Sequence, residues 1–537
     1  MRGGDTSGGP VPDPYRRDVL GLAAKGALAG IAGAVLGPPG SRARAAAASR
    51  THFRALVIGS GFGGSVAALR LGRAGVDTLV VERGREWPVL PARPVFGSST
   101  RVTSTMFWFR RTTRWPGMLP VPVTPAPGVM ELSEERNLDI ACGAAVGGGS
   151  VVYTGVTIAP PRSCFERLYP RGLPYDEFAG RWFPAVRAML RASPMPEDVY
   201  GSAPFAHSRL WDRQLANARM TTRPADSTFD WQVVRRELAH TLPPSATIGE
   251  SDFGCGNGAK RDLTRTYLPA ALATGHVQLR ALHEVRSVGR RRDGTYSVVV
   301  RRLSEDGAAL GTTEYTCEML FLAAGTLNTN RLLVAAREEG RLPDLPATIG
   351  TGFGDNGDQG NLRSQPLEPI GPAQGSPCAS TAFFPTGFGL PLRVENWLLS
   401  GYAGLPATAT FAVTADTDHR GTFRYDPATR RVVLADWTRE KSAAAARAVL
   451  AFSTRVIEAN PGSLPVTVNN LHPFTGHPVG GCVIGSSTDL EGRVKGCKGL
   501  YVVDGSLLPG SVGGANPSLT IAALAERALA GIVAAGG

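Results

Sequence analysis

A continuous apolar run followed by helically spaced apolar positions opens the folded part of the sequence. Residues 55–58, Ala-Leu-Val-Ile, are all apolar, which is typical of a strand buried on both faces. Apolar positions then recur at helical spacing to about Arg73, and Gly75 is suited to end that helix. A second β-type run, Thr78–Val81, precedes Glu82. This order predicts a strand, a helix and a second, parallel strand.

Later apolar runs predict further strands of the same sheet. The runs with β-type composition cover residues 277–282, 296–301 and 313–317. The apolar segment 319–323 then leads through Gly325 into a helical pattern that extends to about residue 337. By contrast, residues 86–137 are rich in proline, arginine and aromatic side chains, which predicts a long irregular excursion.

The segment 350–470 has a different pattern. A glycine- and proline-rich stretch to about residue 389 precedes three β-type runs, over 392–399, 407–414 and 431–437. A helical pattern over 442–459 follows them. We therefore expect a mixed α/β (α+β) fold, in which a Rossmann-like domain is joined to a second domain. The second domain should be built on a mostly antiparallel β-sheet with helices.

Glycines separate the first strand from the first helix in a G-x-G-x-x-G pattern, at Gly59, Gly61 and Gly64. In this motif the first glycine permits the tight turn, the second lets the backbone approach a pyrophosphate, and the third lets helix and strand pack closely. Glu82, 23 residues after Gly59, is placed to accept a hydrogen bond from a ribose hydroxyl. The glycines at 147–149 predict a second close backbone approach, or alternatively a tight internal turn. The pattern predicts a dinucleotide site that NAD would fit as well as FAD; a βαβ unit whose glycine-rich turn binds nothing is the alternative.

Composition limits the partners. The 537 residues carry a formal net charge of +12, but no basic run or interleaving of basic and aromatic residues supports a nucleic-acid partner. A solvated surface explains the spread charge. The seven cysteines form no C-x-x-C pair and no histidine–cysteine cluster at zinc spacing, so we expect no metal site.

The first 50 residues are typical of a targeting segment. Arg16-Arg17-Asp18-Val19-Leu20 resembles a twin-arginine signal and precedes a mildly apolar stretch over 19–36. Cleavage would fall in the alanine-rich run 43–48. A transmembrane anchor is the alternative, but the stretch is glycine-rich and barely long enough. We therefore expect a secreted protein, exported folded with its cofactor.

Blocks near the C-terminus carry the strongest signal after the glycine motif. They are His-Pro-Val-Gly-Gly-Cys from His477, Asp504-Gly505-Ser506, and Asn516-Pro517 before a helical run. Together with Gly-Gly-Gly-Ser at 147–150 and Asp-Leu-Thr-Arg-Thr-Tyr-Leu at 262–268, these blocks resemble the glucose–methanol–choline (GMC) oxidoreductases. Within that family, the chain is most similar to the secreted bacterial cholesterol oxidases with non-covalent FAD. The likeness extends from about residue 52 to about residue 533.

The resemblance implies a role for each matching residue. His477 would hydrogen-bond the substrate hydroxyl, and His472 is the alternative for that role. Asn516 would lie beside the flavin and stabilise its reduced form, and Glu395 falls where the family has a carboxylate base. The residues expected to bind FAD are Gly59, Gly61, Phe62, Gly63, Gly64, Glu82, Gly149, Val285 and Gly505.

The chemistry of these side chains is consistent with alcohol oxidation. Hydride transfer from an alcohol needs a group that accepts a hydrogen bond from the hydroxyl, and a histidine with a pKa near neutrality suits that role. A desolvated carboxylate has a raised pKa and can take and return a carbon-bound proton. The resemblance therefore implies FAD-dependent oxidation of a 3β-hydroxysteroid such as cholesterol, with O2 reduced to H2O2. Glu395 would then isomerise the product to the conjugated 4-en-3-one.

Some positions depart from the family's pattern. They are Tyr153-Thr154 after the Gly-Gly-Gly-Ser block, Ser518, the extra Gly514-Ala515 before Asn516, and Asn396-Trp397 beside Glu395. These departures motivate a second hypothesis, a related flavin oxidase or dehydrogenase for another lipophilic or polyol alcohol. A third hypothesis is a flavin-carrying sterol-binding protein without catalysis.

The same argument predicts domains and partners. After the export segment at 1–50, residues 51–165, 254–350 and 471–537 should form the FAD-binding domain. Residues 166–253 and 351–470 should form the substrate-binding domain. We expect a monomer whose partners are a lipophilic alcohol and O2, with transient contact to a membrane surface and no nucleic acid.

Overall fold

The computed structural model describes residues 50–91, 95–98, 101–113, 121–364, 367–368, 370, 373–398, 407–466 and 473–536. Residues Thr51–Gly537 form one compact unit. The twin-arginine motif, the cleavage run and His472 lie outside the described residues, so the interpretations placed on them stay predictions.

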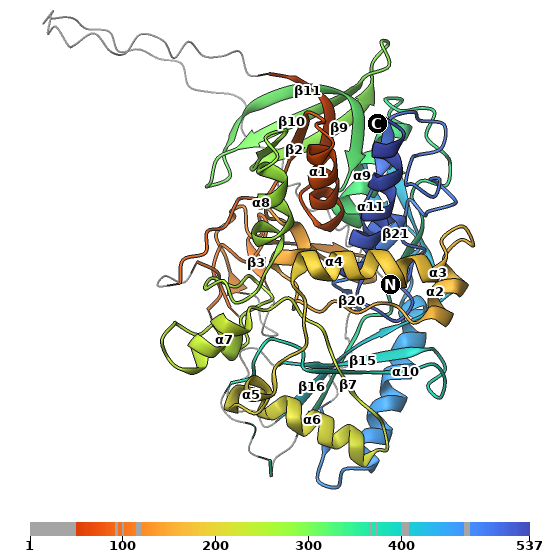
Figure 1. Cartoon of the computed structure of the whole chain (residues 1–537). Helices are drawn as coiled ribbons and strands as arrows, with labels where there is room; N and C mark the ends of the chain where they lie inside the picture. Colours follow the sequence, from red (N-terminus) through yellow and green to blue (C-terminus); the bar gives the residue numbers. More distant parts are fainter. Residues whose placement is uncertain are drawn as a thin grey trace, which may run out of the picture. The chain divides into compact units, whose positions relative to one another are not determined.

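The nucleotide-binding part is built on a seven-stranded sheet (Figure 1). Its strands, in spatial order, are β8 (Val277–Arg280), β2 (Thr78–Val81), β1 (His52–Ile58), β11 (Ala309–Leu322), β10 (Tyr296–Leu303) and β9 (His283–Arg290), and β22 (Leu500–Val502) pairs with β11. The pairs that join β8, β2, β1, β11 and β22 are parallel, whereas β10 and β9 continue the sheet in antiparallel fashion. The predicted Rossmann-like fold is confirmed.

Helices cover this sheet where the apolar periodicity predicted them. Helix α1 (Phe62–Arg73) follows the glycine motif directly and contacts β1, β2 and β11. It also packs against α8 (Tyr267–Leu272) and α11 (Pro517–Ala534). Helix α11 has the length and mean hydropathy to cross a membrane, but 67% of its apolar window is buried in the protein. Its apolar surface is therefore used in packing.

A six-stranded antiparallel sheet forms the other major layer. Its order is β19 (Leu464–Val466), β13 (Gln359–Ser364), β16 (Ala407–Thr414), β15 (Leu392–Trp397), β14 (Ser380–Phe384) and β7 (Arg223–Pro224). Helices α6 (Ala206–Asn217) and α10 (Arg439–Glu458) contact its strands. Val394 and Ala412 join the core formed with these helices. Because side chains alternate along a strand, the neighbouring residues of β15 face the opposite way.

Smaller sheets join segments that the sequence assigned to different domains. Strand β12 (Thr351–Gly354) lies between β17 (Gly421–Asp426) and β21 (Val479–Gly481), and β18 (Arg431–Leu434) pairs with β17. Strand β20 (Phe474–Thr475) pairs with β6 (Leu138–Gly143), which pairs with β5 (Met130–Glu135). Strands β12 and β21 come from opposite sides of a predicted domain boundary. The predicted boundaries themselves stay a prediction. The remaining elements of at least one regular turn or bridge are β3 (Thr112–Thr113), β4 (Val121–Pro122), α2 (Arg162–Leu168), α3 (Tyr175–Glu177), α4 (Phe183–Leu190), α5 (Glu197–Tyr200), α7 (Trp231–Leu238) and α9 (Gly325–Glu338).

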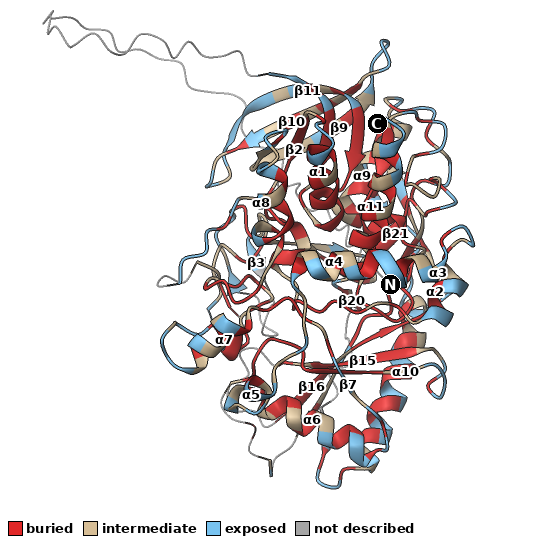
Figure 2. Ribbon diagram, in the orientation of Figure 1, coloured by how far each residue is buried: buried red, intermediate tan, exposed pale blue. Residues whose placement is uncertain are grey.

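Figure 2 shows the burial of the residues along the chain. Burial explains why the apolar pattern did not predict two of the strands, β5 and β9. Strands β5 and β9 carry mostly polar residues of intermediate exposure, so neither gives an apolar run. Two predicted runs, 313–317 and 319–323, are a single strand, β11, whose start is exposed and whose end is buried beside β1.

Candidate active site and cofactor cradle

Three glycines of the opening loop are required by the packing of the protein itself. Gly59 has a φ of +98°, and a Cβ there would lie 2.2 Å from the carbonyl oxygen of Ala323. A Cβ on Gly63 would lie 1.6 Å from the carbonyl oxygen of Val503, and one on Gly64 would lie 2.1 Å from that of Gly59. No side chain can be accommodated at these distances, so these glycines let α1 approach the ends of β11 and β22.

Gly61 and Gly149 border open space. The nearest atom to a Cβ on Gly61 is 4.0 Å away, and a Cβ on Gly149 would meet nothing within 4 Å. Gly61 is also the N-cap of α1, where no side chain of the described residues caps the free N–H groups. A helix N-terminus with an uncapped first turn and room in front of it suits a phosphate. The two glycine loops therefore fit the predicted dinucleotide.

Glu82 anchors the glycine loop. Its Oε2 accepts hydrogen bonds from the backbone N–H of Ser60 at 2.9 Å and from the Ser60 hydroxyl at 2.8 Å, and its Oε1 accepts from the Gly84 N–H at 2.9 Å. The Ser60 hydroxyl oxygen accepts in turn from the N–H of Gly147 at 3.0 Å. Glu82 thus links both glycine loops. Its predicted bond to a ribose hydroxyl stays a prediction, and Oε1, which accepts only one of these bonds, has a further lone pair for it.

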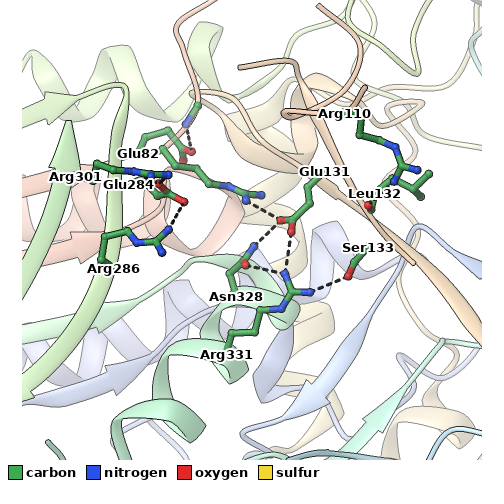
Figure 3. Close-up of polar contacts among 12 residues, drawn as sticks. Glu82, Arg110, Glu131, Leu132, Ser133, Glu284, Arg286, Arg301, Asn328 and Arg331 are labelled. Atoms are coloured by element: carbon green, nitrogen blue, oxygen red, sulfur yellow. Dashed lines mark hydrogen bonds and ion pairs between the residues drawn. The ribbon is translucent and has the colours of Figure 1, made fainter. Parts of the chain in front are cut away.

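A partly buried ion network adjoins Glu82 (Figure 3). Glu131 on β5 accepts from Arg83 at 2.7 Å, from Arg331 of α9 at 2.8 Å and from Asn328 at 3.0 Å. Burial raises the pKa of Glu131, but the two guanidiniums outweigh burial and lower that pKa to about 2. No local sequence pattern predicts this network, because Glu131 and Arg331 are 200 positions apart along the chain.

The remaining predicted cofactor residues lie around the same loops. Phe62 is buried and packs edge-on against Tyr153, with ring centroids 5.5 Å apart. Val285 lies on β9 two residues after His283, whose N–H donates to the Glu82 carbonyl oxygen at 2.8 Å. Gly505 begins a short 3-10 turn, and a Cβ there would lie 2.7 Å from the Thr326 hydroxyl of α9.

The three predicted catalytic side chains come from three separate elements. Glu395 is on β15, Asn516 is the N-cap of α11, and His477 is in the loop between β20 and β21. Glu395 is fully buried, and its Oε2 accepts from the Asn516 side-chain amide at 3.4 Å. Glu395 Oε1 and Asn516 Oδ1 are buried without a hydrogen-bond partner among the described residues. Two unpaired polar atoms at one buried point favour a ligand that supplies their partners.

His477 is held by a residue that the sequence did not predict. The His477 Nδ1 lies 2.9 Å from Oδ1 of the buried Asp358, and Nε2 takes no hydrogen bond from the described part of the chain. The Phe411 ring packs edge-on against the imidazole, with centroids 5.4 Å apart. Asp358 stands in a glycine-rich loop that is typical of a turn, so only the fold identifies its partner.

Electrostatics couple these groups. Burial raises the pKa of Glu395 to about 7, against the opposing effects of His477, Arg393 and the Asn516 amide. Burial lowers the pKa of His477, but the Asp358 and Glu395 carboxylates produce a net rise. A carboxyl group whose pKa is raised to about 7, beside an imidazole whose pKa is also raised, can exchange protons with a substrate at low cost. The arrangement is suited to acid–base chemistry on an alcohol.

This chain is similar to known proteins in sequence and in fold. Residues 53–336 match the N-terminal domain of the GMC oxidoreductases, and residues 415–525 match their C-terminal domain. A cholesterol oxidase of Mycobacterium tuberculosis (strain ATCC 25618 / H37Rv) is 28% identical, covering 89% of this chain and 91% of the relative. A cholesterol oxidase of Acinetobacter baumannii is 25% identical, covering 89% and 94%. The solved structure of a fungal aryl-alcohol oxidase has a TM-score of 0.61 at 15% identity, covering 91% of this chain and 100% of that one.

The family match covers more than half of the sequence, and the cradle at Gly61 and Gly149 has the open space and free N–H groups that the family's FAD needs. The chain belongs to the GMC oxidoreductases and is an FAD-dependent alcohol oxidoreductase.

Proposed function

We propose that this protein is an exported oxidase of a 3β-hydroxysteroid such as cholesterol. Bound FAD would serve as the hydride acceptor and O2 as the final electron acceptor, giving H2O2, and the product would be isomerised to the conjugated 4-en-3-one. The observation that carries the proposal is the buried Glu395–Asn516 pair close to His477, which combines a base for a hydroxyl with a base for a carbon acid. The similarity to two cholesterol oxidases supports the steroid substrate.

Each side chain has a proton-transfer or binding task in this proposal. His477 Nε2 accepts the hydrogen bond, and then the proton, of the substrate hydroxyl. Asn516 uses its side-chain N–H to hold Glu395, and its buried Oδ1 has no partner among the described residues and is available to a ligand. Glu395, with a pKa of about 7, takes a proton from the carbon between the new ketone and the ring double bond. It returns the proton to the far carbon of that double bond, so that the double bond moves into conjugation with the ketone.

The cofactor would be held by the loops that surround Gly61 and Gly149. Uncapped N–H groups at the start of α1 would bind its phosphates, and Glu82 would bind the ribose. The flavin supplies a two-electron acceptor; the protein orients the alcohol and excludes water.

The deciding experiment is anaerobic mixing of the purified yellow holoenzyme with cholesterol. Bleaching of the flavin, followed by H2O2 release on admission of air, is the expected result. A flavin that stays oxidised with cholesterol but bleaches with another alcohol in a peroxide-coupled screen would reject the steroid proposal. Sterol binding without any bleaching would indicate the non-catalytic alternative.

The second candidate is an oxidase or dehydrogenase for another lipophilic or polyol alcohol. It is favoured by Tyr153-Thr154 and Ser518, which depart from the family's pattern and lie beside Phe62 and Val156. The same alcohol screen separates it from the steroid oxidase, because a polyol or aromatic alcohol would then give the higher turnover.

Two substitutions test the assigned roles. His477→Ala should lower turnover by about 100-fold or more, because it removes a general base from the site. Glu395→Gln should release the unconjugated ketone while oxidation continues. Near-wild-type turnover in the first variant, or an unchanged isomer ratio in the second, would reject the corresponding role.

Export is proposed on the sequence pattern. Replacing Arg16 and Arg17 together by lysine should leave the flavoprotein inside the producing cell, and activity in the medium would contradict a twin-arginine route.

A further inference from the structure

The loop after β12 holds both sides of the site. Within Gly354–Asp358, Asn356 has a φ of +57° and its side chain binds the segment that precedes Asn516. Its Oδ1 accepts from the Val512 N–H at 2.9 Å, and its Nδ2 donates to the Ala515 carbonyl oxygen at 3.0 Å. Two residues later, Asp358 binds the segment that carries His477. A single short loop therefore sets the position of Asn516 relative to His477.

Asp358 is saturated with donors from one segment. Its Oδ2 accepts from the Thr475 hydroxyl at 3.0 Å, the Gly476 N–H at 3.0 Å and the His477 N–H at 3.1 Å. Its Oδ1 receives the His477 imidazole Nδ1 at 2.9 Å. Because backbone and ring are bound by the same carboxylate, the orientation of the ring is fixed together with the path of its loop.

We propose that Asp358 is a positioning residue for the alcohol oxidation, which keeps the proton of His477 on Nδ1 and so leaves the Nε2 lone pair for the substrate hydroxyl. This inference rests on the proposed function, since it assigns the direction of a proton transfer in that reaction. A carboxylate only accepts hydrogen bonds, so the ring nitrogen that faces it must carry hydrogen. The second nitrogen is then the only basic one in the neutral ring.

The proton balance follows from this tautomer. The hydroxyl proton of the alcohol passes to Nε2, and the imidazole becomes an imidazolium. The C–H hydrogen leaves with both electrons as hydride to the oxidised flavin, and the alcohol becomes a carbonyl. The positive charge formed on His477 lies against Asp358, so the carboxylate stabilises the ring in the state that the reaction creates.

The groups that face His477 determine its pH dependence. The carboxylates are Asp358 from the loop after β12 and Glu395 from β15, and the Phe411 ring of β16 packs edge-on. Both carboxylates raise the His477 pKa. A base is active when deprotonated, so the acid limb of kcat/KM follows this pKa. Removal of the Asp358 charge should move that limb to lower pH.

The first test is Asp358→Asn, which keeps the size of the side chain and removes its charge. We expect kcat with the best alcohol substrate to fall by about 10²- to 10⁴-fold and the acid limb of kcat/KM to move down by about one pH unit or more. Asp355→Asn is the matched control, because Asp355 is a buried carboxylate of the same loop that bonds to Gly357 and Ser442 and not to His477. An acid limb that moves equally in both variants, or in neither, would overturn the proposal.

The second test is made on the wild-type protein without substrate, and a variant is used only to assign the signal. In holoenzyme labelled with ¹⁵N-histidine, the ring coupling pattern of His477 identifies its neutral tautomer, and the signal is assigned by its loss in His477→Gln. We expect the Nδ1–H form to dominate above the His477 pKa. A dominant Nε2–H form would overturn the proposal. An Nδ1–H form in an enzyme that does not oxidise sterols would leave Asp358 in its role and reject only the steroid substrate.

Discussion

Replacing Glu395 by glutamine should raise the free energy of unfolding, and the gain should grow with pH. Burial raises the pKa of this carboxyl group from 4.5 to about 7 in the folded protein. A raised carboxyl pKa means that folding favours the protonated form. The folded state is therefore at full stability below the unfolded pKa and loses stability as the pH rises from about 4.5 to about 7.

The magnitude follows from the two pKa values. The difference between 4.5 and about 7, at 1.36 kcal/mol for each pKa unit, gives a loss of about 3 kcal/mol above neutrality. At about pH 5 only a small part of this loss has developed, roughly 1 kcal/mol. Glutamine resembles the protonated acid in size and carries no charge, so the variant should keep the stability that the wild type loses. The advantage of Glu395→Gln should thus rise from about 1 to about 3 kcal/mol between about pH 5 and about pH 8.

Urea unfolding of both holoenzymes, with the same excess of FAD at the two pH values, measures this difference. The free energy of unfolding is extrapolated from the midpoint and the slope m at each pH. An advantage that is equal at both pH values, or a wild type that is the more stable protein at about pH 8, would refute a buried carboxyl group of raised pKa.

Glu131→Gln provides a control of opposite sign. The ion pairs with Arg83 and Arg331 outweigh burial and hold the pKa of Glu131 at about 2, so its stabilisation is present above 4.5 and is lost only as the pH falls toward 2. The variant should be less stable than the wild type by about 3–5 kcal/mol, because two guanidiniums lose their partner. That deficit should be the same at about pH 5 and about pH 8, unlike the difference for Glu395→Gln.

Three further substitutions have distinct expected outcomes. Gly61→Ala should give soluble protein that binds FAD less tightly, because its Cβ has 4.0 Å of free space where the pyrophosphate is expected; unchanged flavin content after dialysis would contradict this. Gly63→Ala should abolish soluble expression, since its Cβ would lie 1.6 Å from the Val503 carbonyl oxygen, and a well-folded variant would disprove that contact. Lys260→Met should lower the free energy of unfolding by about 3 kcal/mol or more, because it leaves the carbonyl oxygens of Val151, Tyr153 and Ser251 without their donor; equal urea midpoints would refute this.

The elements predicted from sequence are those whose signal is local. The strand, glycine turn and helix around Gly59 were predicted because apolar runs and glycine positions act over a few residues. The strand Ala407–Thr414 was predicted with its observed bounds for the same reason. Strand β5 was not, because Met130–Glu135 is mostly polar and its key side chain, Glu131, is stabilised by arginines elsewhere in the chain.

The same limit applies to the site. His477, Glu395 and Asn516 were named from the resemblance to the family. The fold brings the side chains of Glu395 and Asn516 into contact and puts His477 within electrostatic range. Their catalytic roles stay predictions. Asp358 was missed because its partner is 119 positions away, and an aspartate between glycines has the local pattern of a turn.

The register of β15 explains why Asn396, which departs from the family's pattern, can flank Glu395 without disturbing it. Asn396 faces away from the site, where its Oδ1 accepts from the Ser208 hydroxyl of α6 at 2.6 Å, and Val394 packs in the core with the same helix. Arg393 and Glu395 face the other way, toward Gly514 and Asn516. Since strand side chains alternate, a slip of one residue would bury Glu395 under α6 and present Asn396 to the flavin side. The apolar contacts of Val394 and the bond of Asn396 to Ser208 therefore hold the Glu395 carboxylate on the face of β15 that carries the site.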